Sequence, residues 1–310
     1  MTLHTWQISF NDYFVSIGNQ LAAAIISPGS KQYPVSCHGS QKSFVLHETT
    51  SEEVKIIIDN LLVSKSVRMN DIPIHILKTC KQILSPFLAQ LFNRWVKTSI
   101  YPEFLKCTQV IPIHKGGQKS LYKLYAYIPA VSIWTNFEKL IYIRLYSYVE
   151  QNKMLSDSQY GFRSGLSTSM AIYDIHENLL KNREEKYTTC AIFCDLSKAF
   201  DTIGHSILLH KLEHFYGIRG LPLKLLTSFL PDRQRYTVVE GCKSDVQNIN
   251  RRVPQGSMLG PPLFALYIND LPKFSRFRTT MFADDTLLSF SSNKPTRPEH
   301  TNKCWSAKDR

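Results

Sequence analysis

Hydrophobic and polar positions follow two different periods along this chain. Up to about residue 187 the apolar residues recur every three or four positions, which is typical of helices that bury one face. From Thr188 onward, short apolar runs of strand length alternate with helical segments. The pattern therefore predicts a helical N-terminal half that leads into an α+β C-terminal half.

Several helix boundaries carry recognisable signals. The stretch Thr50-Ser51-Glu52-Glu53 is a capping box, in which two side chains satisfy free backbone amides, and it predicts a helix start. The next helical segment, residues 72–96, is expected to break at Pro86 and to bury Ile76 and Ile83. Further helices are expected at residues 137–149, 166–180, 203–215, 222–230 and 259–271.

The strand signals are short apolar runs that end at turns or at acidic residues. Strands are expected at residues 109–115, 188–195, 235–240 and 245–250. The last two strands would pair across the turn Gly241-Cys242. Residues 291–310 are polar, contain two prolines and are expected to form a tail.

Carboxylates occupy the ends of two predicted strands. The pair Asp284-Asp285 lies between the apolar runs 280–283 and 286–290, which predicts a β-hairpin with the acids at its tip. Asp195 ends the strand 188–195. Two strands that deliver carboxylates to one end of a sheet can build a site for two Mg²⁺ ions about 3.5–4 Å apart. The pair alone would be ordinary turn chemistry, so the second strand carries the argument.

The charge of the chain favours a polyanionic partner. Its 310 residues have a formal net charge of +12 and a pI of about 9.3, with 43% hydrophobic residues, which fits a globular protein that contacts nucleic acid or an anionic surface. The basic residues are dispersed, which suits a broad groove better than a lipid-binding arm. They include Arg233, Arg235, Lys243, Arg251 and Arg252.

Cysteine usage and hydropathy indicate the compartment. Seven cysteines without a CxxC pair suggest free thiols in a reducing environment. Cys190 and Cys194 share one face of a predicted strand and are expected to be core thiols. No secretory signal or membrane-spanning run is visible, so we expect nuclear or cytoplasmic residence without membrane contact.

One motif suggests a different chemistry. His210, Glu213 and His214 match the H-x-x-E-H pattern of inverted zinc peptidases. Leu212 between them must face the core, and no distant acidic ligand is evident. A surface helix rich in histidine is therefore the favoured interpretation, and a zinc hydrolase is the alternative.

Three stretches now combine into one resemblance. They are Phe193-Cys194-Asp195-Leu196-Ser197-Lys198-Ala199-Phe200-Asp201, Val253-Pro254-Gln255-Gly256-Ser257 and Phe282-Ala283-Asp284-Asp285. They resemble, in this order, the catalytic motifs of reverse transcriptases from non-LTR (LINE-type) retrotransposons, with the jockey-like and RTE-like branches fitting equally. Further similar segments, at residues 10–14, 111–117, 137–141 and 159–163, extend the match over about residues 10–290.

The resemblance implies a right-hand polymerase with fingers and palm, and with the thumb missing. The expected divisions are a lead-in segment (1–49), a fingers-like helical region (50–187), a palm (188–290) and the polar tail (291–310). Residues 234–257 would contribute to the fingers. The implied partners are an RNA template, a DNA primer and deoxynucleoside triphosphates; the oligomeric state stays open.

The family's metal ligands map onto three aspartates. Asp195, Asp284 and Asp285 would bind two Mg²⁺ ions, with Mn²⁺ as a substitute, and the Leu196 carbonyl could complete a metal shell.

Four further residues match positions that contact the incoming nucleotide. Phe200 lies where the family places the side chain that excludes a 2′-hydroxyl, although helix-start packing is the alternative reading. Gln255 and Gly256 match the turn that contacts nucleotide and template, and Lys115 matches a cation on the triphosphate.

The departures from the family pattern bear on activity. Ile128 stands where an arginine would grip the triphosphate, Arg252 replaces a usual glycine, and Pro262 is unusual in its helix. Beyond Asp285 no primer grip, thumb or endonuclease segment is evident. We therefore expect a truncated polymerase domain, either an RNA-directed DNA polymerase with residual activity or a nucleic-acid-binding remnant without catalysis.

Overall fold

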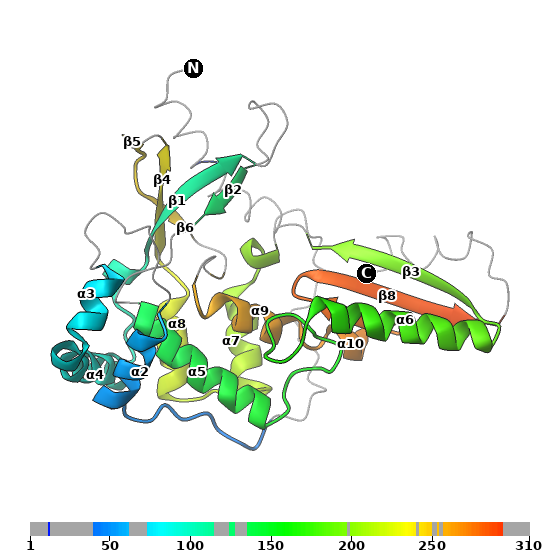
Figure 1. Ribbon diagram of the computed structural model, residues 1–310, viewed down its shortest axis with the longest axis horizontal. Coiled ribbons are helices and arrows are strands. Elements are labelled where there is room, and N and C mark those ends of the chain that lie inside the picture. Colours follow the sequence, from blue (N-terminus) through cyan, green and yellow to red (C-terminus); the bar gives the residue numbers. More distant parts are fainter. Residues whose placement is uncertain are drawn as a thin grey trace.

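Two sheets and a layer of helices form the described part of the protein (Figure 1). The structure is a computed structural model. It describes residues 12, 40–61, 73–114, 124–127, 135–196, 199–239, 242–249, 253 and 257–293. The mixture of helices and sheets agrees with the predicted α+β class. None of the described helices is long and apolar enough to cross a membrane.

The N-terminal helical layer contains α2 (Ser51–Asp59), α3 (Ile74–Thr79), α4 (Lys81–Thr98) and α5 (Thr135–Gln151). The capping box is confirmed: the Thr50 hydroxyl accepts from the Glu53 amide at 3.2 Å, and the Glu53 carboxylate accepts from the Thr50 amide at 2.9 Å. This exchange satisfies two of the backbone donors that a helix start leaves without partners.

The predicted break at Pro86 is wrong, because the helix is interrupted at Cys80 and Pro86 lies inside α4. A proline near a helix start removes only one backbone bond, which the buried face of the helix can offset. Ile76 and Ile83 are not part of the buried core cluster. They are 42% and 70% exposed, which contradicts their predicted burial.

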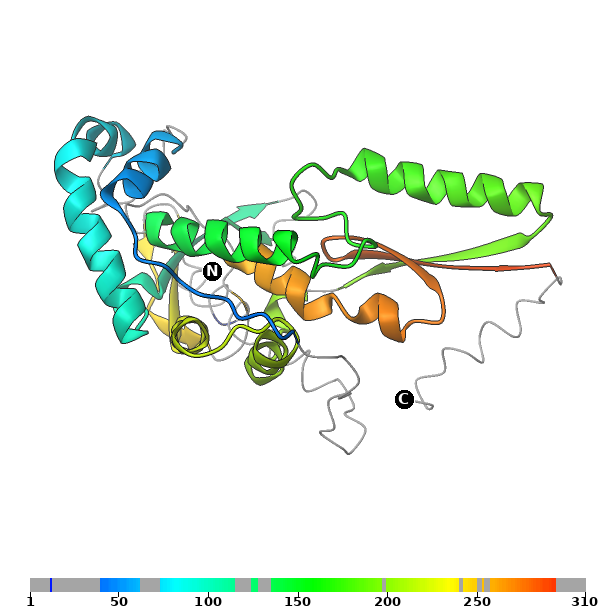
Figure 2. The same cartoon turned by 90° about the horizontal axis from the view of Figure 1, so that it is seen from below.

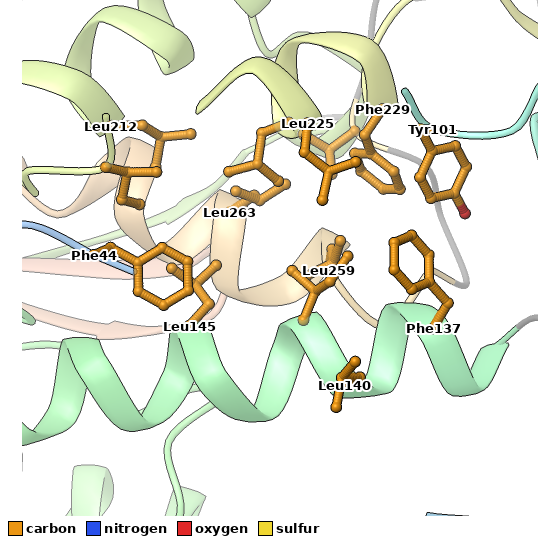
Figure 3. Packing of buried hydrophobic residues seen from close by; sticks show 14 of the residues in the cluster. Phe44, Tyr101, Phe137, Leu140, Leu145, Leu212, Leu225, Phe229, Leu259 and Leu263 are labelled. Atoms are coloured by element: carbon orange, nitrogen blue, oxygen red, sulfur yellow. The ribbon is translucent and has the colours of Figure 1, made fainter. Parts of the chain in front are cut away.

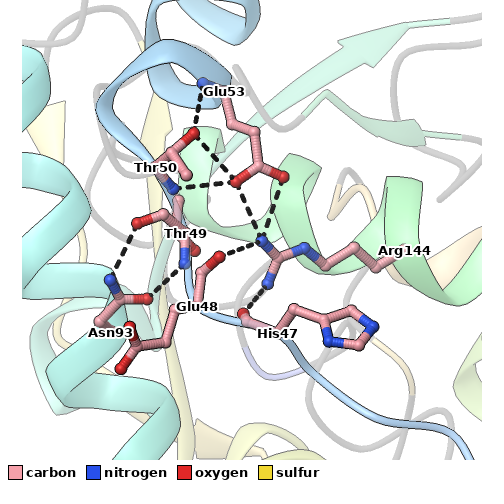
Figure 4. A network of polar contacts seen from close by, with 7 residues as sticks. All are labelled: His47, Glu48, Thr49, Thr50, Glu53, Asn93 and Arg144. Carbon is pink, nitrogen blue, oxygen red and sulfur yellow. Dashed lines mark hydrogen bonds and ion pairs between the residues drawn. The ribbon is translucent and has the colours of Figure 1, made fainter.

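A polar network joins three of these helices (Figure 4). The Arg144 guanidinium of α5 contacts both carboxylate oxygens of Glu53 at 3.2 Å and donates to the His47 carbonyl. Asn93 of α4 bonds to both the amide and the carbonyl of Thr49, at 2.7 and 2.9 Å. Burial raises the pKa of Glu53, but the Thr50 amide and Arg144 outweigh it, and the net pKa is lowered.

The first sheet contains β1 (Cys107–His114), β2 (Leu124–Tyr127), β4 (Arg233–Val239), β5 (Cys242–Lys243) and β6 (Gln247–Ile249). Its order is β2-β1-β4-β5, and β6 also pairs with β4. β1 runs parallel to β4, and the antiparallel pairing of β4 with β5 and β6 confirms that the predicted strands pair. Cys242, predicted to lie in the turn, belongs to β5 instead, because it pairs with Val239.

Arg233 and Arg235 do not belong to a surface groove, contrary to the sequence interpretation. They are 4% and 0% exposed, because alternate residues of the central strand β4 face the interior. The Arg233 guanidinium lies over the rings of Phe229 and Tyr101, at 4.3 and 5.6 Å from their centroids.

The second sheet contains β3 (Thr188–Asp195), β7 (Arg278–Phe282) and β8 (Asp285–Ser292), in the order β3-β8-β7. The helix α6 (Thr168–Glu184) runs along this sheet (Figures 1 and 2). The buried Asn182 side chain of α6 ties it to β3 and β8 through Thr189 and Ser291, at 3.1 and 2.7 Å. These contacts set the position of α6 over the sheet.

The remaining helices all lie between β3 and β7 in the sequence. They are α7 (His205–His214), α8 (Leu221–Phe229), α9 (Gly260–Ile268) and α10 (Leu271–Phe274), with short 3-10 turns at Glu103–Leu105 and Ala199–Asp201. The central core lies where α5, α7, α8 and α9 meet (Figure 3). Leu263 of α9, Leu212 of α7 and Leu145 of α5 are fully buried there. The burial of most of α9 explains why nearly all of its residues are apolar.

Candidate active site

The two acidic stretches meet at one end of the second sheet. Asp195 is the last residue of β3 and pairs in register with Asp285, the first residue of β8. Directly opposed residues of antiparallel strands carry side chains on one face, with Cβ atoms about 4.5–5.5 Å apart. The structure therefore brings together two carboxylates that are 90 residues apart in the sequence.

Asp284 lies in the two-residue turn of the predicted hairpin, which the structure confirms. Phe282 pairs with Asp285, so Ala283 and Asp284 form the loop. Ala283 has a φ of +57°, and Asp284 is not among the residues with positive φ, which is the pattern of a type II′ turn. A non-glycine residue with a positive φ costs about 1–3 kcal/mol. The turn therefore needs support from its surroundings.

That support comes from the buried side chain of Gln159. Its Oε1 accepts from the Ala283 amide at 3.1 Å and from the Gly161 amide at 2.8 Å. Its Nε2 donates to the Ala283 carbonyl at 3.4 Å. The neighbouring segment also pairs with β7, since the Tyr160 amide donates to Met281 at 2.8 Å.

Gly161 is required at its position by close packing. A Cβ atom there would lie 2.1 Å from the Ala283 amide nitrogen, which is backbone and cannot move aside cheaply. The sequence motif at residues 159–163 is thus a clamp on the acidic turn, a role that sequence reasoning missed.

In the part of the chain that the structure describes, protein cations do not neutralise these carboxylates. Among the described residues, no lysine, arginine or histidine forms an ion pair with Asp195, Asp284 or Asp285. Like charges placed opposite each other on a sheet destabilise it. Oxygen donors of this kind suit Mg²⁺, which is typically bound by one or two carboxylates together with water and substrate phosphates.

The geometry for a complete metal cage is not present in the described residues, where no group of three or more acidic, histidine or cysteine side chains is arranged to hold an ion. The described residues instead offer the carboxylate pair of Asp195 and Asp285, with Asp284 in the adjacent turn. It fits a metal that takes its other ligands from water and substrate.

A cavity of about 440 Å³ lies between α6 and the acidic end of the sheet. Asp195 and Asp285 line it, and its other walls are mostly apolar. They include Ala171, Ile172, Ile175, Phe193, Phe282 and Leu287. Asp195 and Asp285 themselves are exposed, so solvent and substrate can reach them.

Phe200 lies in the 3-10 turn Ala199–Asp201, which follows β3. Its ring stacks on Phe264 of α9 at a centroid distance of 4.6 Å and meets the edge of Phe162 at 6.1 Å. Its carbonyl accepts from the Val253 amide at 3.1 Å. The Leu196 carbonyl accepts from the Ala199 amide at 3.1 Å, which leaves it one lone pair for another ligand.

Three of the expected nucleotide contacts, Lys115, Gln255 and Gly256, lie outside the described residues, as do Ile128 and Arg252. Their roles stay predictions. The flanks of the turn that carries Gln255 are described, at Val253 and from residue 257 onward.

Glu138 of α5 contacts this second flank. Its carboxylate accepts from the Ser257 hydroxyl at 2.6 Å and from the Met258 amide at 3.0 Å. Its other oxygen accepts from the Tyr101 hydroxyl at 2.6 Å. Burial raises the pKa of Tyr101 well above its usual value, and the Glu138 charge raises it further. Burial also lowers the pKa of Arg233, which lies over the same ring.

The zinc site and the core thiols considered in the sequence analysis fare differently from the acidic site. The rings of His210 and His214 stack on each other at 4.2 Å, and Leu212 is buried as expected. No metal-binding group forms around them within the described residues. The core-thiol interpretation is wrong for Cys190, which is exposed, because β3 is an edge strand of its sheet; Cys194 is half-buried.

Comparison with known proteins agrees with this geometry. Residues 129–307 match the family described as reverse transcriptase (RNA-dependent DNA polymerase). The probable RNA-directed DNA polymerase from transposon BS of Drosophila melanogaster is 28% identical over 271 residues, which are 82% of this chain and 29% of that protein. The RNA-directed DNA polymerase from mobile element jockey of the same species is 30% identical over 239 residues, 75% of this chain and 25% of that protein.

A third relative is the probable RNA-directed DNA polymerase from transposon X-element of Drosophila melanogaster, which is 29% identical over 218 residues, 66% of this chain and 23% of that protein. The chain thus spans about a quarter of the length of these relatives. The family match covers more than half of the chain and includes all three aspartates. This protein therefore belongs to the reverse transcriptase (RNA-dependent DNA polymerase) family, and its sequence groups with polymerase domains of LINE-type retrotransposons.

Proposed function

We propose that this chain is an RNA-directed DNA polymerase domain that adds deoxynucleotides to a DNA primer on an RNA template. In this reaction the primer 3′-oxygen forms a bond to the α-phosphorus of the nucleotide. The bond to the leaving pyrophosphate breaks. The observation that carries the proposal is the register of Asp195 opposite Asp285, beside the clamped turn of Asp284.

The three aspartates would hold divalent metal ions, Mg²⁺ or Mn²⁺. When bound, such ions supply charge neutralisation on the triphosphate and a lowered pKa of the primer hydroxyl. The protein's own contribution is to fix the carboxylates at the end of a sheet. Among the described residues, no lysine or arginine side chain pairs with them and competes with a metal ion. Their mutual repulsion favours a cation at this position.

Other residues would orient the substrates. The sheet β3-β8-β7 would belong to the palm, and α2 to α6 with the first sheet would belong to the fingers. Phe200 would exclude a 2′-hydroxyl, and the ring contacts to Phe264 and Phe162 would hold it against displacement. Lys115, Gln255 and Gly256 would contact the incoming nucleotide.

Primer extension tests the proposal directly. Purified protein is incubated with dTTP on poly(rA)/oligo(dT), first in Mg²⁺ and then in Mn²⁺. Asp195→Asn and Asp284→Ala should each lower incorporation by about 10³-fold, because each removes a metal ligand worth several kcal/mol of transition-state stabilisation. Asp157→Asn, which changes an exposed aspartate of the neighbouring 156–161 segment, is the matched control and should retain activity.

Absence of incorporation at every enzyme concentration, from folded protein that still retards RNA on a gel, would refute the proposal. That outcome would assign the chain to the alternative class of nucleic-acid-binding remnants. RNA binding whose affinity falls steeply with salt would then be its remaining activity.

A further inference from the structure

We propose that Arg163 is a positioning residue for the acidic turn, because it ties the clamp on that turn to the helix α5. Its catalytic purpose rests on the proposed function, in which the position of Asp284 matters for the reaction. The segment concerned, residues 156–163, lies between α5 and α6 in the chain and passes the tip of the β7–β8 hairpin (Figure 2).

One side of this segment is joined to the second sheet. The Tyr160 amide donates to the Met281 carbonyl at 2.8 Å, and the Met281 amide donates to the Ser158 carbonyl at 2.7 Å. Between these two contacts, the side chain of Gln159 holds the Ala283 amide. Because packed protein interiors transmit small shifts, a displacement of the segment would be passed to β7 and to the acidic turn.

Arg163 joins the other side of the segment to α5. Its Nε and Nη2 donate to the two carboxylate oxygens of Glu150, at 3.0 and 3.1 Å. Its Nη1 donates to the Ser156 carbonyl at 3.2 Å and, at the longer distance of 3.5 Å, to the Gln159 carbonyl. One guanidinium thus closes residues 156–163 into a loop and fixes that loop to the last turn of α5.

The loop needs this restraint because its backbone is strained next to the arginine. Phe162 has a φ of +59°, a left-handed conformation that is unfavourable for a residue other than glycine. Gly161, on its other side, lies against the Ala283 backbone. A strained conformation persists only where its surroundings hold it, and here the close contact of Gly161 and the bonds of Arg163 lie on either side of it.

Arginine is suited to this junction and lysine is not. The planar guanidinium makes two parallel bonds to one carboxylate and directs a further N–H at the backbone. The Arg163 side chain is 15% exposed and that of Glu150 is 29% exposed, so water screens this pair less than a surface pair. A lysine would keep the charge, but its single nitrogen cannot reproduce the bidentate contact and the backbone contacts together.

The test compares Arg163→Lys with Arg144→Lys. Arg144 is a matched control, because it also projects from α5, contacts both carboxylate oxygens of Glu53 and donates to the His47 carbonyl. Its bonds lead to residues 47–53 and not to the acidic turn (Figure 4). Both variants should lower the melting temperature, since each loses charge-assisted bonds.

The first measurement requires neither metal nor catalysis. The Ala283 amide is buried and bonded to Gln159, so its hydrogen exchange reports whether the clamp is closed. We expect exchange at Ala283 to be at least about tenfold faster in Arg163→Lys and to change by less than about twofold in Arg144→Lys. The double variant Gln159→Leu/Arg163→Lys should exchange at Ala283 no faster than Gln159→Leu alone, because both changes act through one contact.

The second measurement is primer extension with dTTP on poly(rA)/oligo(dT). A misplaced carboxylate acts on the chemical step, so kcat should fall by about tenfold or more in Arg163→Lys, while the KM for dTTP stays within about twofold. In Arg144→Lys both constants should stay within about twofold, at a temperature where both variants are folded.

Unchanged exchange at Ala283 in Arg163→Lys would overturn the inference. An equal acceleration in Arg144→Lys would also overturn it, because the effect would then be a general loss of stability. Faster exchange with an unchanged kcat would refute the catalytic purpose of the contact. A parent protein that incorporates no nucleotide, although only Arg163→Lys opens the clamp, would refute the proposed function while supporting the positioning of the turn.

Discussion

The clamp on the acidic turn makes a quantitative prediction for Gln159→Leu. Leucine has nearly the same volume but no acceptor, so the amides of Ala283 and Gly161 lose their partner in a site where the Gln159 side chain is fully buried. Each unsatisfied buried amide costs about 1–3 kcal/mol, so the free energy of unfolding should fall by about 2–6 kcal/mol. The melting temperature should fall by at least about 4 °C.

The same change should affect catalysis more than stability alone explains. The turn holds Asp284, and an unsupported left-handed Ala283 can relax and carry the carboxylate away from its partner. Misplacement of a reacting group by about 1 Å can cost about 100-fold in rate. Incorporation measured at 20 °C below the melting temperature of the variant, where it is folded, should therefore fall by at least about tenfold.

Gln151→Leu is the matched control. Gln151 is exposed on α5, and among the described residues its side chain bonds only to the Ser147 hydroxyl of the same helix, at 3.0 Å. The same chemical change there should alter the free energy of unfolding by less than about 0.5 kcal/mol and leave incorporation unchanged. If Gln159→Leu behaved like Gln151→Leu in both measurements, the clamp would have no role in stability or activity.

Three further predictions concern packing and charge. Gly161→Ala should destabilise the fold by about 1–3 kcal/mol in urea titration, because the added Cβ meets the Ala283 backbone at 2.1 Å; unchanged stability would show that the turn can yield. The lowered pKa of Glu53 means that its contact with Arg144 adds stability that is fully present above about pH 4.5 and is lost as the pH falls through the folded-state pKa. Arg144→Ala should therefore flatten the pH dependence of melting between about pH 5 and 3, and an unaltered profile would contradict this cause. Phe193→Ala should change the free energy of unfolding by less than about 0.5 kcal/mol despite the size of the ring, since 80% of Phe193 is exposed; a loss above about 2 kcal/mol, seen by the same titration, would argue against that exposure.

Local signals in the sequence were sufficient for most elements. The capping box at Thr50 marked the start of α2, and the apolar run before Asp195 matched β3 from Thr188 onward. The acidic pair at residues 284–285 marked a hairpin. For the capping box and the hairpin the deciding interactions lie within a few residues, so the pattern and the structure express the same local physics.

Local patterns failed where distant packing decided the outcome. Pro86 has a low helix propensity, yet the buried face of α4 retains it, and the break moves to Cys80. Charge suggested a surface role for Arg235, but the central position of β4 buries it. Alternation suggested a core thiol at Cys190, but β3 lies at a sheet edge. Propensity and composition do not record which neighbours a residue will have.

The sequence by itself determined the class of the protein. Each acidic motif and its flanking apolar run is a short contiguous stretch, so the motifs and their order can be recognised without the fold. Only the tertiary structure decided how the acids are held. Gln159 reaches Ala283 across 124 residues, and Glu138 reaches Met258 across 120. Hydrogen bonds from a side chain to a distant backbone amide produce no periodic pattern in the sequence. They depend on the relative position of two separate elements in the fold and not on the spacing of residues within either one.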